Sequence, residues 1–152
     1  MRKAMLLLAF FGLVGLVWAA DPHVGTWKLN VAKSRISSGA ADRSAVVICT
    51  AQDSGIKLVS DGVDADGKPF HAEFTAKYDG KDYPFKGESD IDTVALRRID
   101  ANTWSEVLKK DGKEVVSGQN AISKDGKTMT RTVKGKTATG QDINNTIVYD
   151  KQ

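Results

Sequence analysis

The residues best suited to metal binding or nucleophilic catalysis in this chain are its two histidines, His23 and His71, and its one cysteine, Cys49. A zinc site takes Cys, His and carboxylate ligands at short, regular spacings, and these three residues lie far apart without such a spacing. A Cys49–His71 pair would need both side chains on the same face of a sheet. We therefore expect no metal site and interpret His71 as a surface or cavity-lining strand residue.

The acidic turn around Asp64 is the strongest candidate for a cation site. Counted from Gly62, four residues occupy positions 3, 5, 6 and 12 of an EF-hand calcium loop: Asp64, Asp66, Gly67 and Glu73. Position 1 is a glycine where that loop has a carboxylate, and no flanking helices are predicted. An ordinary Asp-Gly hairpin explains the same residues, and we interpret the segment as a turn.

Other catalytic patterns are missing from the sequence. No serine lies in a Gly-x-Ser-x-Gly motif, and phosphate-binding glycine loops are absent. No basic and aromatic face suited to single-stranded nucleic acid stands out. The groups that could converge in a pocket are Arg97 or Arg98 with Glu106 and His71. The sequence therefore favours a non-enzymatic protein without a cofactor.

The first 19 residues have the pattern of a secretory signal peptide. Arg2 and Lys3 precede an apolar run at residues 4–18, which is shorter than the roughly 20 residues of a membrane-spanning helix. Small residues end the run. We expect cleavage after Ala19 or Ala20, no stable membrane insertion of the product, and export to the periplasm or the medium.

The remaining residues, 20–152, have the size of one domain. Loss of Arg2 and Lys3 with the leader reduces the 22 basic residues to 20, against 19 acidic ones, so the net charge falls from +3 to +1. Such a balance gives no support to a nucleic-acid or anionic-membrane partner. Cys49 follows a β-branched run and has no disulfide partner in the chain, so we expect a buried thiol that packs as a small hydrophobe.

Turn signals divide the rest of the chain into strands. Asp-Gly pairs and related clusters tolerate the positive φ angles of tight hairpins. They separate nine candidate strands, at residues 24–30, 45–51, 56–63, 70–77, 93–99, 103–109, 114–122, 128–134 and 142–149. Residues 31–43 form the longest connection, and residues 82–92 are less regular, with room for one further short strand. The pattern predicts an all-β antiparallel up-and-down fold of eight or nine strands with little helix.

Polar residues recur on the strand faces that carry large apolar ones. Glu106 shares a face with Trp104, and Arg131 shares one with Met129. A solid sandwich core excludes most such groups because their burial without partners is costly. A barrel with a partly wet interior tolerates them, so the alternation favours a barrel with a small cavity.

Two short motifs stand at the ends of the mature chain. Residues 24–29 read Val-Gly-Thr-Trp-Lys-Leu, and residues 146–151 read Thr-Ile-Val-Tyr-Asp-Lys. The first resembles the opening strand of the calycins, which include lipocalins and intracellular fatty-acid-binding proteins, and the second resembles the closing strand of the fatty-acid-binding branch. The resemblance implies one lipocalin-like barrel. It also implies that Gly25 and Trp27 close one end, with Arg131 stacked over the indole.

The chain also departs from the fatty-acid-binding pattern. In that branch an Arg two residues before the closing Tyr helps to hold the ligand carboxylate, whereas here Ile147 precedes Tyr149 at that spacing. Residues 31–43 leave no room for the two-helix lid. The chain therefore resembles an exported bacterial-type lipocalin-like domain more closely. Arg97 or Arg98 could replace the lost charge, and as sequence neighbours at most one of them points inward.

These observations predict an exported lipocalin-like protein that binds a small, apolar ligand inside the barrel. Size and alternation select eight lining candidates: Phe70, Phe74, Tyr78, Leu96, Trp104, Leu108, Met129 and Tyr149. The alternative is an envelope or secreted interaction module, whose barrel is filled and whose outer face or rim loops bind a protein. An internal cavity distinguishes the two hypotheses.

Overall fold

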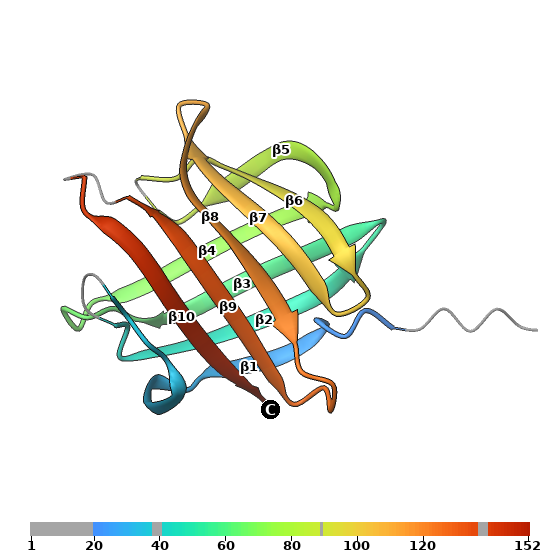
Figure 1. The fold of residues 1–152 in the computed structure, drawn as a ribbon, viewed down its shortest axis with the longest axis horizontal. Coiled ribbons are helices and arrows are strands. Elements are labelled where there is room, and N and C mark those ends of the chain that lie inside the picture. Colours follow the sequence, from blue (N-terminus) through green and yellow to red (C-terminus); the bar gives the residue numbers. More distant parts are fainter. Residues whose placement is uncertain (1–19, 38–40, 89, 137–139) are drawn as a thin grey trace, which may run out of the picture.

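The fold is a closed antiparallel barrel, seen in a computed structural model that describes residues 20–37, 41–88, 90–136 and 140–152. Each strand pairs with the next along the chain, and the first closes against the last (Figure 1). The strands are β1 (Gly25–Leu29), β2 (Ser44–Gln52), β3 (Gly55–Val63), β4 (Pro69–Lys77), β5 (Asp79–Lys86), β6 (Thr93–Asp100), β7 (Thr103–Lys110), β8 (Lys113–Ile122), β9 (Thr128–Lys136) and β10 (Asp142–Lys151). One 3-10 turn, η1 (Val31–Lys33), follows β1.

The predicted up-and-down architecture is confirmed, but the predicted strand number was wrong because the barrel has ten strands. The additional strand is β5, in a stretch that contains Pro84. It pairs with β4 at two positions, Glu73↔Lys86 and Phe74↔Phe85, and its ladder with β6 is irregular. A proline lacks the amide hydrogen of a regular ladder and is tolerated where pairing is already interrupted. Because of this irregularity, β5 does not show a clear alternation of apolar and polar residues in the sequence.

The hairpin turns have the chemistry that the sequence predicts. Asp111 and Gly112 join β7 to β8 with φ angles of 51° and 74°, which suit a two-residue type I′ turn. In the acidic turn, an Asp64 carboxylate oxygen accepts a hydrogen bond from the Lys68 amide at 2.8 Å. That carboxylate therefore stabilises a hairpin. Among the described residues, no group of three His, Cys, Asp or Glu side chains is arranged to hold a metal ion.

The two ends of the barrel differ, and we call them the floor and the mouth. The floor is the end at which β1 begins, and it is covered by the segment that holds Asp21 and His23. The mouth is the opposite end, where η1 and the segments that contain Asp42 and Glu88 lie. Because each strand is antiparallel to the next, successive connections lie at opposite ends of the barrel.

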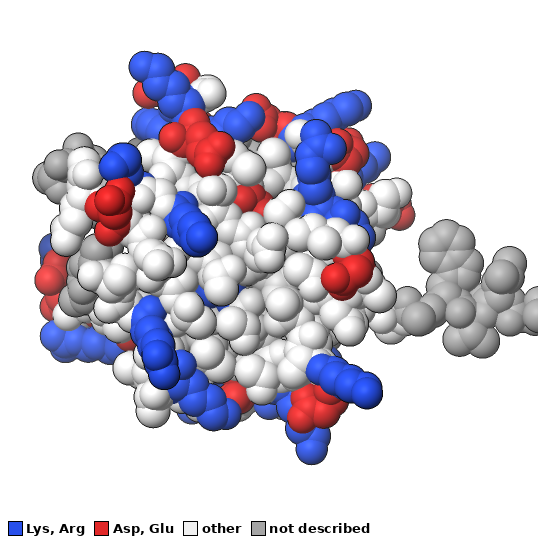
Figure 2. All heavy atoms as spheres, in the orientation of Figure 1, with Lys and Arg blue, Asp and Glu red and all other residues white. Residues whose placement is uncertain are grey.

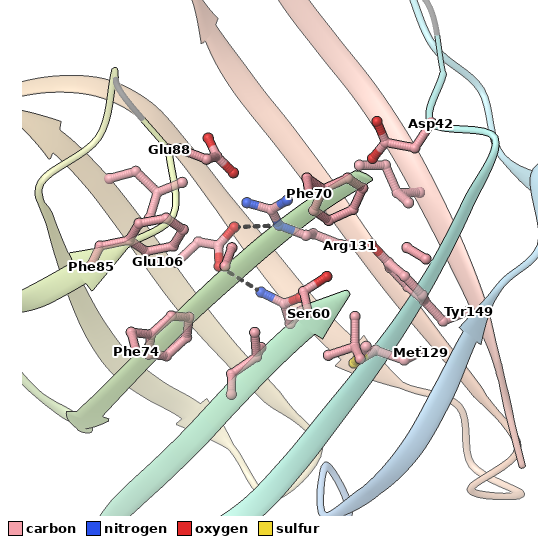
Figure 3. Close-up of a pocket in the computed structure, with 17 residues that line it drawn as sticks. Asp42, Ser60, Phe70, Phe74, Phe85, Glu88, Glu106, Met129, Arg131 and Tyr149 are labelled. Carbon is pink, nitrogen blue, oxygen red and sulfur yellow. Dashed lines mark hydrogen bonds and ion pairs between the residues drawn. The ribbon is translucent and has the colours of Figure 1, made fainter. Parts of the chain in front are cut away.

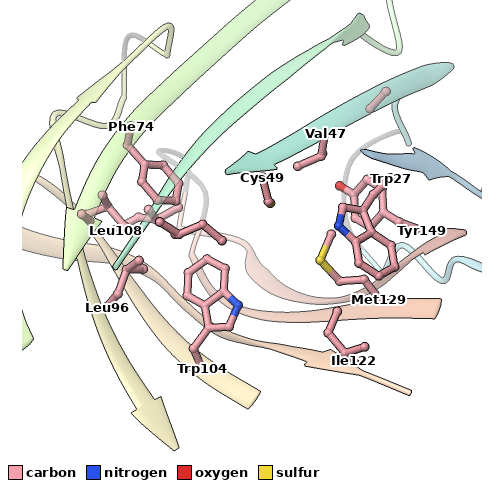
Figure 4. Close-up of a cluster of buried hydrophobic side chains, with 14 of the residues drawn as sticks. Trp27, Val47, Cys49, Phe74, Leu96, Trp104, Leu108, Ile122, Met129 and Tyr149 are labelled. Atoms are coloured by element: carbon pink, nitrogen blue, oxygen red, sulfur yellow. The ribbon is translucent and has the colours of Figure 1, made fainter. Parts of the chain in front are cut away.

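One apolar cluster extends through the interior of the barrel (Figure 4). Its largest fully buried members come from different strands: Trp27, Ile56, Leu96 and Trp104. Cys49 lies in the same cluster with 1% of its surface exposed, which confirms the predicted buried thiol. Burial, reinforced by the nearby Asp21 charge, raises the pKa of the Cys49 thiol to about 12. The thiol is therefore protonated at neutral pH and packs as a hydrophobe.

The surface carries charges of both signs. Figure 2 shows basic and acidic side chains interspersed around the edges of the face formed by β8, β9 and β10. The centre of this face is largely uncharged, because outward positions of these strands are occupied by residues such as Thr132, Gln119 and Thr146. Within the described part of the chain, no helix has the length and apolar character to cross a membrane.

Candidate functional site

A cavity of about 120 Å³ lies inside the barrel towards its mouth (Figure 3). Its wall is mostly apolar, and strands from all around the barrel contribute to it. Phe74 and Phe85 stack on one side, with ring centroids 5.9 Å apart and planes inclined by 30°. An engineered apolar cavity of roughly 150 Å³ binds benzene, so this volume suits a ligand body of about that size.

Three polar side chains form a connected group in the cavity wall. The Glu106 carboxylate, which is 4% exposed, accepts hydrogen bonds from Arg131 Nε at 2.6 Å and from Asn120 Nδ2 at 3.1 Å. Burial by itself lowers the pKa of Arg131, but the adjacent Glu106 charge outweighs this effect and the pKa is raised. The group therefore consists of a charged guanidinium and a carboxylate whose two oxygens are both hydrogen-bonded, as buried polar groups require.

Two further carboxylates lie at the mouth. Asp42 precedes β2 and Glu88 follows β5, and both line the cavity although each residue as a whole is exposed. The surrounding protein raises the pKa of both carboxyl groups. Neighbouring acids add to this effect: Asp64 raises the pKa of Asp42, and Asp42 itself raises that of Glu88. Arg131 opposes it at both positions. The mouth is therefore a region of excess negative charge.

A second cavity of about 210 Å³ adjoins the first at the mouth. It lies between the residues that precede β2, the first half and middle of β10 and the segment around η1, and it shares Asp42 and Ile147 with the barrel cavity. Leu29 and Ile36 contribute to its wall. Asp42 consequently lies where the two cavities meet.

The structure separates the eight predicted lining residues by their depth in the barrel. Five lie around the cavity: Phe70, Phe74, Leu108, Met129 and Tyr149. Three are not part of the cavity wall, namely Tyr78, Leu96 and Trp104, and Tyr78 and Trp104 contact Asp21 and His23 at the floor instead. Trp104 is fully buried and makes edge contacts with the rings of His23, Phe74 and Tyr78. Strand alternation identifies the inward face of a residue, but it carries no information on depth along the barrel axis.

Trp27 is fully buried at the floor, where its indole N–H donates a hydrogen bond to the His23 carbonyl at 2.8 Å. The cation over its ring is Lys151, whose Nζ lies 5.0 Å from the centroid, and the predicted stacking of Arg131 there is wrong. The register gives the reason. Trp27 pairs with Lys151, whereas Arg131 pairs with Ile147. Four residues along β10 separate the two levels by about 13 Å.

Gly25 permits this arrangement of Lys151. Its φ angle is +142°, a conformation that L-residues with a side chain rarely adopt, and a Cβ there would lie 2.9 Å from Lys151 Cε. The missing side chain leaves room for the lysine stem beside the Trp27 ring. The Gly-x-Trp motif is therefore a feature of floor construction.

A charged network seals the floor. The Asp21 carboxylate accepts hydrogen bonds from His23 Nδ1 and Tyr78 Oη, both at 3.0 Å, and from Arg98 Nη2. The Arg98 guanidinium also lies over the Tyr78 ring, 3.8 Å from its centroid. Burial raises the pKa of Asp21, but the hydrogen bonds from His23 and Arg98 outweigh it, and the pKa lies well below its usual value of 3.8. Of the two neighbouring arginines, Arg98 points inward and Arg97 is exposed.

The residues named as the best enzymatic group lie in three different places. Glu106 lines the cavity, and Arg98 belongs to the floor network. His71 is on the outer face of β4, where its Nδ1 lies 2.7 Å from an Asp61 oxygen. Cys49 faces inward and His71 outward, so the two cannot form a dyad.

Sequence reasoning did not select the polar residues of the cavity as ligand-lining positions. Arg131 and Glu106 were placed on inward faces by alternation, and that signal was sufficient to locate them. Asp42 and Glu88 lie outside the strands, where no periodicity applies. Phe85 lies in β5, which the sequence did not resolve as a strand.

No model of a known protein family matches this chain, and no curated protein is significantly similar to it. The closed antiparallel barrel is consistent with a calycin-like fold. Its ten strands exceed the eight of lipocalin barrels.

Proposed function

We propose that this protein is an exported, non-enzymatic, lipocalin-like binding protein that holds a small ligand, apolar over most of its surface, inside the barrel. The observation that carries the proposal is the cavity of about 120 Å³ at the mouth of a barrel whose other end is sealed. Ligand sites are typically concave and mostly apolar, with a few fixed polar groups, and this cavity has that composition. The signal-like leader supports export.

A non-enzymatic role is supported by the distribution of reactive groups. A general acid or base must lie within hydrogen-bond reach of the group that it serves. Within the described residues, both carboxylate oxygens of Glu106 accept hydrogen bonds from side chains of the wall, and His71 faces solvent. The cavity therefore offers binding groups rather than an assembled catalytic set.

The alternative is a protein-interaction module. Val46 and Ile48 lie two residues apart on the outer face of β2, with 38% and 43% of their surfaces exposed, and they favour a protein contact there. This hypothesis also requires a filled barrel. The cavity favours the small-ligand hypothesis.

A cavity-filling variant tests the proposal. Ala72 lines the cavity and is 6% exposed, so Ala72→Leu places three additional carbons in the ligand space. We expect binding of benzyl alcohol, measured by NMR titration of the purified protein, to weaken by about tenfold or more, because lost apolar contact is worth about 1.5–3 kcal/mol per buried side chain.

The matched control is Ala121→Leu, at a position on the outer side of β8. We expect it to leave benzyl alcohol binding unchanged. Equal binding by the wild type and both variants would contradict a site inside the barrel. Mass spectrometry of protein purified without detergent provides an independent test, because a bound small molecule is expected to co-purify.

A further inference from the structure

The charges around the cavity do not balance. Among the described residues of its wall, Asp42, Glu88 and Glu106 supply three carboxylates and Arg131 supplies one guanidinium, a formal sum of −2. Arg131 and Glu106 are paired at 2.6 Å and compensate each other. Figure 3 shows Asp42 and Glu88 on different sides of the cavity, and among the described residues neither forms a hydrogen bond or ion pair with Arg131. The excess charge therefore belongs to these two mouth carboxylates.

The surroundings of the two mouth carboxylates reinforce this excess. After burial, the charges that act on Glu88 are Arg131, which lowers its pKa, and three acids that raise it: Asp42, Asp90 and Glu106. Asp42 has the same pattern, with Asp64 raising its pKa and Arg131 lowering it. An additional anion would be repelled by these groups, whereas an additional cation would be stabilised.

An independent observation is the hydroxyl of Tyr149. Tyr149 is 8% exposed, lines the cavity, and forms no hydrogen bond with any described residue. Its oxygen is not sealed in the protein interior, so it is accessible to a ligand in the cavity. The oxygen can accept a hydrogen bond from a ligand. Tyr149 and Phe70 also contribute aromatic rings to the cavity wall, and the face of an aromatic ring attracts a cation.

We propose that the ligand is a small monocation, with an apolar body among the phenylalanines and a protonated amine at the mouth that faces Asp42, Glu88 and the Tyr149 hydroxyl. This inference rests on the proposed function and adds the charge of the ligand. A carboxylate ligand is disfavoured, because the wall has a formal sum of −2 and the single positive charge of Arg131 is compensated by Glu106.

Three probes of nearly equal size test the inference: benzylamine, benzyl alcohol and benzoate. They share one ring and carry a positive, zero and negative charge at neutral pH. We measure their dissociation constants for the purified protein by NMR titration at low ionic strength. We expect benzylamine to bind about fivefold or more tightly than benzyl alcohol, since a partly exposed charge pair contributes up to about 1 kcal/mol, and benzoate to bind most weakly.

A double variant tests whether the preference for benzylamine comes from the two mouth carboxylates. In the double variant D42N/E88Q we expect benzylamine affinity to fall to that of benzyl alcohol, while benzyl alcohol affinity is unchanged. The control is D53N/E114Q, which makes the same two chemical changes at exposed positions outside the cavity wall. We expect the control to keep the preference of the wild type.

The outcomes distinguish this inference from the proposed function. If benzyl alcohol binds as tightly as benzylamine, or benzoate binds more tightly than both, the inference is overturned while the small-ligand function stands. A cation preference that survives in D42N/E88Q also overturns it. If none of the three probes binds at millimolar concentration, both the proposed function and the inference fail.

Discussion

The floor and the mouth of this barrel differ in how far their carboxylates are compensated by neighbouring groups. At the floor, the Asp21 carboxylate is hydrogen-bonded to Arg98, Tyr78 and His23, and aromatic rings pack against the network. At the mouth, no described side chain forms a hydrogen bond or ion pair with Asp42 or Glu88, and burial and neighbouring acids outweigh the effect of Arg131, so that their pKa values are raised rather than lowered. Balanced charge at the floor is consistent with a structural role, whereas we propose that a ligand compensates the excess negative charge beside the cavity.

The largest expected difference between the two ends is in packing. Trp27→Ala removes a fully buried side chain at the floor and its hydrogen bond to His23, and we expect it to lower the free energy of unfolding by about 3–5 kcal/mol. Phe70→Ala at the mouth removes a half-buried ring that borders empty space, and we expect a loss of at most about 2 kcal/mol. Urea denaturation measures both, and equal losses would contradict the comparison.

The floor network should make the protein sensitive to acid. The folded pKa of Asp21 lies below its usual value, so its contribution to stability is complete above about pH 4 and is lost as the pH falls towards the folded pKa. We expect Asp21→Asn to reduce the free energy of unfolding at pH 7 by about 1–3 kcal/mol.

The same variant should lose less stability than the wild type between about pH 4 and pH 2. Urea midpoints across this range measure the difference. Parallel pH profiles for Asp21→Asn and the wild type would show that the network is not the acid-sensitive element. Asp53→Asn, at an exposed turn position, is the control.

Removal of the mouth carboxylate charges should have the smallest effect on the free energy of unfolding, with a sign opposite to that of Asp21→Asn. Because the folded pKa values of Asp42 and Glu88 are raised, the folded state binds protons more tightly than the unfolded state does. Stability therefore falls as the pH rises through the usual carboxyl range. We expect D42N/E88Q to leave the free energy of unfolding at pH 7 unchanged or to raise it by up to about 0.5 kcal/mol.

Denaturation at pH 7 and pH 4 measures this effect, and the difference between D42N/E88Q and the wild type should diminish at the lower pH. A loss of more than about 1 kcal/mol at pH 7 would assign these carboxylates to the structural framework. The contrast with the floor would then disappear.

The comparison also explains which parts of the site were predictable. Alternation along β7 and β9 placed Glu106 and Arg131 on inward faces, and both are found there. The partner of Arg131 was wrong because pairing across strands depends on register. Asp42 and Glu88 were not identified, since they lie in connections whose course is set by the rest of the barrel.

The sequence by itself determined the local geometry of this protein. Asp-Gly pairs specify hairpin turns, alternation specifies which face of each strand is buried, and a Gly before Trp27 specifies a place where backbone and side chains approach closely. These are short-range properties, because φ preferences and strand pleat act over a few residues. They were sufficient for an all-β up-and-down fold and for the buried state of Cys49.

Only the tertiary structure decided how many strands close the barrel and what lies at each depth inside it. The irregular strand β5, Lys151 over Trp27, and the meeting of Asp42, Glu88 and Tyr149 at one cavity all depend on register around a closed sheet. A shift of two residues in one ladder preserves every inward face yet moves each side chain by about 7 Å along the strand. Local sequence patterns are the same before and after such a shift, whereas the residues of the site come together in only one register.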